Sequence, residues 1–68
     1  MEYKDYIITE LVNDKGQWQA EVRRRDGGHL RVQGTTLPRF MTPHADSENE
    51  AVRIAKEAID NRMISAAS

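Results

Sequence analysis

The sequence predicts an α+β fold, in which a three-stranded antiparallel β-meander carries one C-terminal α-helix on one face. Three observations lead to this prediction. Residues 6–12 and 17–24 are rich in β-branched, aromatic or alternating apolar residues, as strands are. Glycine-containing turn sequences follow each of these segments. A capped segment with apolar residues at helical spacing begins at residue 47.

The chain has 68 residues, which is the size of one small domain. Apolar residues make up 38% and charged residues 31%, a balance typical of folded domains rather than disordered chains. The sequence contains no cysteine, which excludes disulfide scaffolds, thiolate zinc sites and cysteine nucleophiles. No apolar run is long enough for a membrane span and no leader is recognisable. We therefore expect a cytoplasmic bacterial protein with one domain over residues 1–64 and a frayed tail at 65–68.

The first hairpin is expected to join residues 6–12 to residues 17–24 through the turn sequence at residues 13–16, with Gly16 in a left-handed conformation. In the second strand, Trp18, Ala20 and Val22 alternate with polar residues, which is typical of a half-buried strand.

The register of this hairpin depends on its loop. A three-residue loop sets Val12 opposite Trp18 and Ile8 opposite Val22, all pointing inward, with Trp18 as the central core residue. A slip by one residue would exchange the two faces of the first strand, and the sequence leaves this register open.

A third strand is expected at residues 29–33, after a three-residue loop at Arg25-Asp26-Gly27. This loop would create three cross-strand pairs, namely Val22 with Leu30, Ala20 with Val32, and Glu21 with Arg31. A two-residue loop is the alternative, but it would put Leu30 on the polar face. We therefore predict the three-residue loop.

Residues 34–46 have an irregular composition that includes Pro38 and Pro43, which argues against a long central strand. We expect Phe40 and Met41 to form an edge segment or a short fourth strand.

The helix has the clearest sequence signals. Ser47 and Glu50 form a capping box, in which the serine hydroxyl accepts from a backbone N–H and the Glu50 carboxylate reaches back. An apolar stripe follows at helical spacing, comprising Ala51, Ile54, Ala55, Ala58, Ile59 and Met63. The small alanines predict close packing of this helix on the sheet.

Catalytic residues are not recognisable in this sequence. Neither histidine, His29 or His44, belongs to a pattern with an acid and a nucleophile, and their spacing does not define a metal site. Gly27-Gly28 is turn sequence without the strand-to-helix context of a phosphate loop. We therefore expect no enzymatic activity, no cofactor and no bound metal.

The basic side chains are unevenly distributed. The net charge is −1, yet residues 15–45 hold six of the ten basic residues and only two of the eleven acidic ones. Arginine is well suited to phosphate and guanine contacts, and a sheet face can enter a DNA groove. This gives a nucleic-acid hypothesis based on Gln19, Arg23, His29 and Arg31. The alternative is that these arginines only solubilise an exposed hairpin.

The first strand is apolar on both faces, although one helix covers only one face of a sheet. With the three-residue loop, Ile7 and Leu11 lie outside. They are either scattered surface residues or an interface for a protein partner. A weak homodimer or a hetero-partner is therefore expected.

The strand Gly16-x-Trp18-x-Ala20-x-Val22 and the capped helix with Ser47, Glu50, Ala51, Ala55 and Ile59-Asp60 resemble small uncharacterised bacterial domains of strand-strand-strand-helix type. The same layout resembles the arm-binding domain of tyrosine recombinases, whose three-stranded sheet reads DNA. This resemblance implies DNA contacts by Gln19, Arg23 and Arg31.

A second resemblance involves Leu37-Pro38, Thr42, Asp46-Ser47, Glu50-Ala51 and residues 55–59, which are similar to the segment through the helix of HicB-type antitoxins. This resemblance implies a small ribonuclease toxin as partner. We therefore expect a small non-enzymatic binding module for nucleic acid or, alternatively, for a protein.

Overall fold

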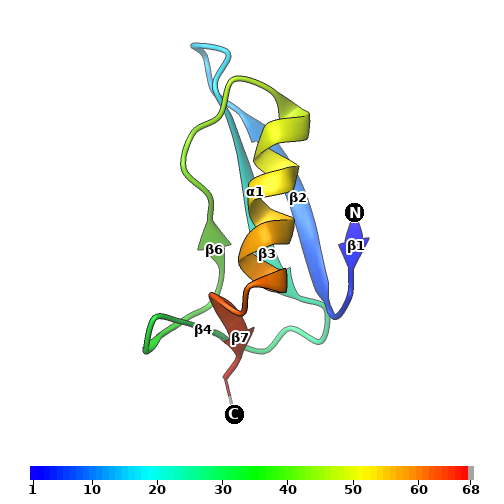
Figure 1. The fold of residues 1–68 in the computed structure, drawn as a ribbon, viewed down its shortest axis with the longest axis vertical. Coiled ribbons are helices and arrows are strands. Elements are labelled where there is room, and N and C mark those ends of the chain that lie inside the picture. Colours follow the sequence, from blue (N-terminus) through cyan, green and yellow to red (C-terminus); the bar gives the residue numbers. More distant parts are fainter. Residues whose placement is uncertain (68) are drawn as a thin grey trace.

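The computed structural model describes residues 1–67 and confirms an α+β fold built from antiparallel sheets and a helix (Figure 1). The elements in chain order are β1 (Glu2–Tyr3), β2 (Tyr6–Val12), β3 (Trp18–Arg24), β4 (Leu30–Val32), β5 (Thr35–Leu37), β6 (Phe40–Met41), α1 (Glu48–Asp60) and β7 (Ile64–Ala66). They form a four-stranded sheet in the order β1-β2-β3-β6 and a three-stranded sheet in the order β5-β4-β7.

The first hairpin has the register of the three-residue loop. Val12 lies opposite Trp18 and Ile8 opposite Val22 in the antiparallel pair of β2 and β3. The turn is closed by the Asn13 side chain, whose Oδ1 accepts from the backbone N–H of Gln17, and Gly16 has a φ of 76°. Glycine is favoured there because other residues are strained at positive φ.

A strand forms at Leu30–Val32 within the expected range, but its predicted pairing with β3 is wrong. Residues 29–33 do not pair with β3, so the Val22–Leu30, Ala20–Val32 and Glu21–Arg31 pairs are absent from the described ladders. The neighbour of β3 is instead the short edge strand at Phe40 and Met41, which pairs with Val22 and Glu21.

The reason for this difference lies in the turn after β3. Arg24 donates from Nη1 to the carbonyls of His29 (3.2 Å) and Ala67 (3.0 Å), and from Nη2 to Asp26. The guanidinium packs so closely on Gly28 that a Cβ there would lie 2.6 Å from Arg24 Nη1. The hydrogen bond from the Gly28 N–H is the main reason why the pKa of the Asp26 carboxyl lies below its ordinary value, and the hydrogen bond from Arg24 lowers it further. These contacts fix a turn that leads the chain away from β3.

The second sheet forms at the end of the molecule where the tail was expected to fray. β4 pairs with β5 on one side and with β7 on the other, so that Val32 lies opposite Ile64. Ile64 is buried, and the N–H of Ala67 donates to the carbonyl of His29. Ser65 and Ala66 therefore belong to a paired strand, Ala67 is hydrogen-bonded to His29, and Ser68 lies outside the described residues.

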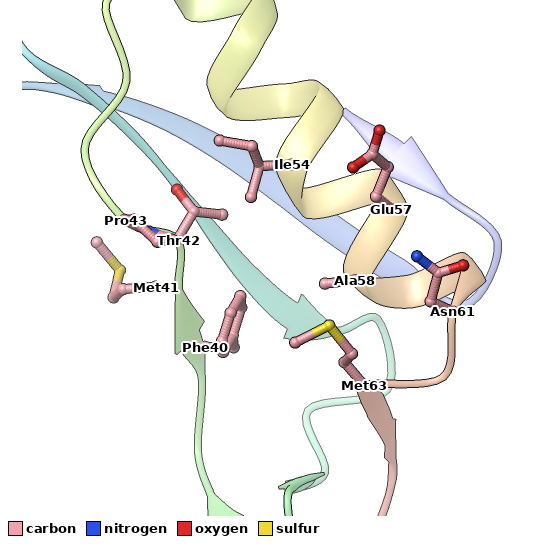
Figure 2. Close-up of a pocket in the computed structure, with 9 residues that line it drawn as sticks. All are labelled: Phe40, Met41, Thr42, Pro43, Ile54, Glu57, Ala58, Asn61 and Met63. Atoms are coloured by element: carbon pink, nitrogen blue, oxygen red, sulfur yellow. The ribbon is translucent and has the colours of Figure 1, made fainter.

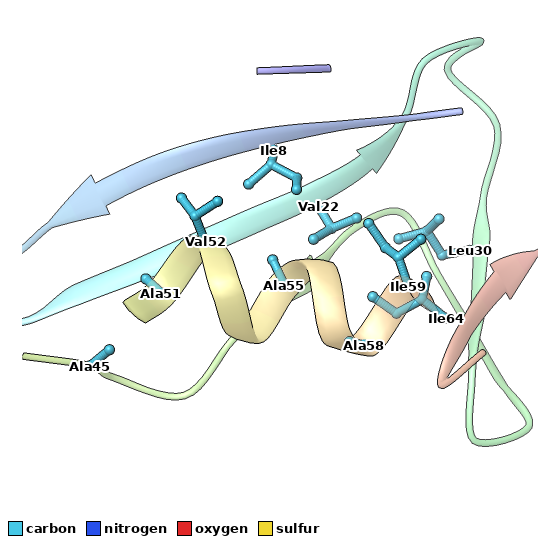
Figure 3. Close-up of a cluster of buried hydrophobic side chains, with 11 residues drawn as sticks. Ile8, Val22, Leu30, Ala45, Ala51, Val52, Ala55, Ala58, Ile59 and Ile64 are labelled. Carbon is cyan, nitrogen blue, oxygen red and sulfur yellow. The ribbon is translucent and has the colours of Figure 1, made fainter. Parts of the chain in front are cut away.

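The core fills the space between α1 and the β2–β3 hairpin and continues toward the second sheet (Figure 3). Its largest fully buried apolar side chains are Ile8, Val22 and Leu30. Trp18 is not the central residue that the sequence indicated, because it lies at the end of β3 that meets Ala45 and is only partly buried.

The helix begins as predicted, with Ser47 Oγ accepting from the N–H of Glu50 at 3.2 Å. The Glu50 carboxylate approaches Arg53 (3.7 Å) instead of completing the capping box. The buried face comprises Ala51, Val52, Ala55, Ala58 and Ile59. The stripe therefore includes Val52, whereas Met63 lies beyond the helix and is 46% exposed.

Val12 shares the inner face of β2 with Ile8 but is 54% exposed, because the hairpin extends past the start of α1 (Figure 1). Within residues 1–67, no helix has the length and apolar character that a membrane crossing requires.

Candidate functional site

The outer face of the four-stranded sheet is the side opposite α1. Ile7 lies opposite Arg23, and Leu11 lies opposite Gln19. Because side chains alternate along a strand, these four residues point away from buried Ile8 and its neighbours. The structure thus brings together both residues predicted for a partner interface and two of the four predicted for nucleic acid.

The sequence did not indicate the other members of this face. Met41 joins it from β6, opposite Glu21, and Arg39 joins by donating to Glu21. The pairing of β3 with β6 connects residues about twenty apart in the chain, and no local pattern predicts it.

The charges on the outer face are arranged around one carboxylate. Glu21, whose side chain is only 12% exposed, lies 2.8 Å from Arg23 Nε and 3.2 Å from Arg39 Nη1. The Gln19 amide is also engaged, because its Nε2 donates to the Thr42 carbonyl at 2.9 Å. The Arg39–Glu21 and Gln19–Thr42 contacts therefore link β3 to the segment around β6, and fewer polar groups of this face remain free for contacts with bases.

His29 and Arg31 lie elsewhere. Arg31 belongs to β4, where it is opposite Thr36 on one side and Ser65 on the other. His29 precedes that strand, and its carbonyl accepts from Arg24 and Ala67. The residues predicted for nucleic acid are thus divided between two sheets.

An apolar pocket of about 480 Å³ opens between β6 and α1 (Figure 2). Its lining residues are Phe40, Met41, Thr42, Pro43, Ile54, Glu57, Ala58, Asn61 and Met63. In Figure 2, Phe40 and Ala58 face the pocket from opposite sides, and Met63 lies at its lower end. Glu57 is the single charged residue in this lining. We refer to this pocket as the β6–α1 groove.

A separate polar cluster links the N-terminal strand to the end of the helix. The Tyr3 hydroxyl and Lys4 Nζ both donate to the Asp60 carboxylate. Both hydrogen bonds hold the pKa of the Asp60 carboxyl below its ordinary value, and the bond from Lys4 has the larger effect. The same bonds raise the pKa values of Tyr3 and Lys4. This cluster joins the N-terminal segment to the end of α1.

Among the described residues, histidines and acids do not gather in groups of three or more that could hold a metal ion. Comparison with known protein families, with curated proteins and with solved structures finds no significant match to this chain.

Proposed function

We propose that this chain is a non-enzymatic protein-binding module and that a second copy of the chain covers the outer face of its sheet. The observation that carries the proposal is the position of Ile7, Leu11 and Met41 on the face away from α1. Leu11 is 42% exposed, and burial of such a side chain stabilises by about 1.5–3 kcal/mol.

A second copy suits this face because the face is self-complementary. Apolar side chains project from β2 and β6, and a two-fold axis would bring apolar residues of one copy against those of the other. Glu21 compensates one of the two positive charges of Arg23 and Arg39, so these three groups leave a net charge of +1 on each copy. Both arginine side chains are more than half exposed, so they can stay in contact with water at the rim of a small interface and avoid the cost of desolvation.

The size of the face predicts a weak dimer. Two seven-residue strands flanked by two two-residue strands give roughly 300 Å² of projected sheet, with strands about 4.8 Å apart. A standard stable interface buries about 800 Å² per partner. We therefore expect dissociation constants in the high micromolar range, about 0.1–1 mM.

Nucleic-acid binding is the second hypothesis, and it has less support. Gln19 and Arg23 already contact Thr42 and Glu21, and Arg31 lies in the other sheet. Binding that depends on phosphate contacts would also weaken steeply with salt, whereas an apolar dimer would not.

Sedimentation equilibrium tests the proposal. The wild type is expected to dimerise as its concentration approaches about 1 mM, and Leu11→Glu is expected to remain monomeric. Val12→Glu is the matched control, because Val12 is exposed to a similar degree in the same strand but on the opposite face.

A wild type that remains monomeric at about 1 mM would refute the proposal. Salt-dependent binding of duplex DNA, lost in an Arg23→Ala variant, would favour the second hypothesis.

A further inference from the structure

We propose that the β6–α1 groove binds an extended peptide segment of a partner protein, with an apolar side chain in the groove and a lysine or arginine near Glu57. The peptide would add to the free edge of β6. Met41 borders both this groove and the outer face, but the other residues named for the outer face do not line the groove, so the inference does not depend on dimerisation.

The groove provides an apolar site of suitable size. Its volume of about 480 Å³ lies within the usual range of ligand sites, about 300–1,000 Å³. Phe40 and Ile54 contribute apolar surface from opposite elements, and Ala58 leaves room between them. Two flexible thioethers, Met41 and Met63, allow the walls to adapt to different side chains.

The edge of β6 provides main-chain partners beside this site. The N–H of Thr42 donates to the Ala20 carbonyl, and Phe40 lies opposite Val22. Because main-chain groups alternate along a strand, the N–H and C=O of Met41 point away from β3. β6 is the last strand of its sheet, so within residues 1–67 no strand pairs with these groups.

Prolines limit this edge to a short segment. Pro38 and Pro43 flank β6, and a proline has no N–H to offer to an added strand. The edge therefore admits about one bonded residue pair and does not support an extended sheet between copies. Most of the binding energy must then come from the side chain in the groove, as in other peptide-recognition sites that combine an edge with a pocket.

The negative charge of the groove favours a basic residue in the peptide. Glu57 is the only charged lining residue, and the hydrogen bond from Arg53 (2.7 Å) engages one of its two oxygens, Oε1. In an extended peptide, alternate residues face the same side and are about 7 Å apart. A basic residue two positions from the apolar anchor can therefore reach toward Glu57.

Selection from a phage-displayed library of random peptides tests the inference, with a folded Met63→Glu variant as the negative target. Met63 is exposed and lies outside the helix, so this change should preserve the fold, which circular dichroism checks. The wild type is expected to enrich peptides with an apolar residue and a basic residue two positions apart. Met63→Glu should weaken a selected peptide at least about tenfold, which is 1.4 kcal/mol. The matched control is Leu11→Glu on the outer face, which should bind as the wild type does.

A charge reversal provides the second measurement. Glu57→Lys is expected to shift selection from basic to acidic residues at the second position, an effect that a structural role of Glu57 would not produce. Amide shifts on peptide binding should centre on Met41, Asn61 and Met63. The inference is overturned if the wild type enriches no peptide over Met63→Glu, if Glu57→Lys leaves the preference unchanged, or if the shifts centre on Leu11 and Gln19.

Discussion

Thr42 offers a sharp test of how β6 is held against β3. The residue is 1% exposed, and its Oγ1 accepts the hydrogen bond from the Ala20 N–H at 2.9 Å. A side-chain oxygen thus occupies the place that a carbonyl has in a regular ladder, because the Thr42 carbonyl is directed instead to the Gln19 amide. The substitution Thr42→Val keeps the shape of the side chain but removes this acceptor.

The expected loss of stability depends on which group loses its partner in each variant. Thr42→Val leaves the buried Ala20 N–H without a partner, which costs about 1–3 kcal/mol. Thr42→Ser keeps the acceptor and removes one methyl group, at a cost of about 0.5–1.5 kcal/mol. A 68-residue domain has a total stability of about 3–10 kcal/mol, so both effects are large enough to measure.

Urea denaturation followed by tryptophan fluorescence distinguishes these cases. With a slope of about 1 kcal/mol per molar urea, Thr42→Val should lower the midpoint by about 1–3 M and Thr42→Ser by less. If Thr42→Val is as stable as the wild type while Thr42→Ser is clearly weaker, the methyl group and not the hydroxyl holds β6, and the reasoning fails.

Three further predictions concern the core, the helix cap and pH. Ile8→Ala should cost about 2–5 kcal/mol because the side chain is fully buried, whereas Val12→Ala in the same strand should change the denaturation midpoint little. Ser47→Ala should cost about 1 kcal/mol by removing the acceptor at the helix start, and an unchanged midpoint would contradict the cap. The lowered pKa of Asp60 means that its bonds with Lys4 and Tyr3 stabilise the fold above the ordinary carboxyl pKa, near 4. This contribution is lost as the pH falls through the folded pKa, so wild type and Asp60→Asn should differ at pH 7 and converge in strong acid. Equal midpoints at pH 7 would count against this role.

The parts of the fold that depend on local chemistry were predictable from the sequence. The β2–β3 hairpin follows from alternation and from a turn that contains Gly16. Its register stays open in the sequence, and the structure has the register of the three-residue loop. The start of the helix follows from Ser47, because serine is favoured at the N-cap, where its hydroxyl accepts from the N–H of Glu50. In both cases the interacting residues are close in the chain.

The remaining part depends on contacts between distant residues. Arg24 belongs to an alternating strand by its sequence, yet its guanidinium binds the carbonyl of Ala67 at the other end of the chain. That contact, together with β7, decides that β4 leaves the main sheet. The sequence indicates Trp18 as the central residue because a large aromatic in a short chain is usually central, whereas in the structure a helix rich in alanine packs on Ile8 and Val22.

Only the part of the candidate site that lies on the first hairpin was predictable from the sequence. Ile7, Leu11, Gln19 and Arg23 share a face because the first hairpin alone determines their position. His29 and Arg31 were assigned to the same face through the wrong third strand, and Met41 was missed because β6 reaches β3 only in the folded chain. The β6–α1 groove had no sequence signal, since its walls come from two elements that meet only through tertiary packing.

The late position of β7 has a consequence for the order in which the chain folds. The β2–β3 hairpin closes between Val12 and Trp18, whereas the β4–β7 pair joins Val32 to Ile64. Loop-closure entropy makes the longer connection less favourable by about 1.5 kcal/mol, so the hairpin and helix should dominate the transition state. Substitutions at Ile64 should then accelerate unfolding and leave the folding rate nearly unchanged. For the same reason, the segment from His29 to Leu37 should be the first part of the native molecule to open to a protease.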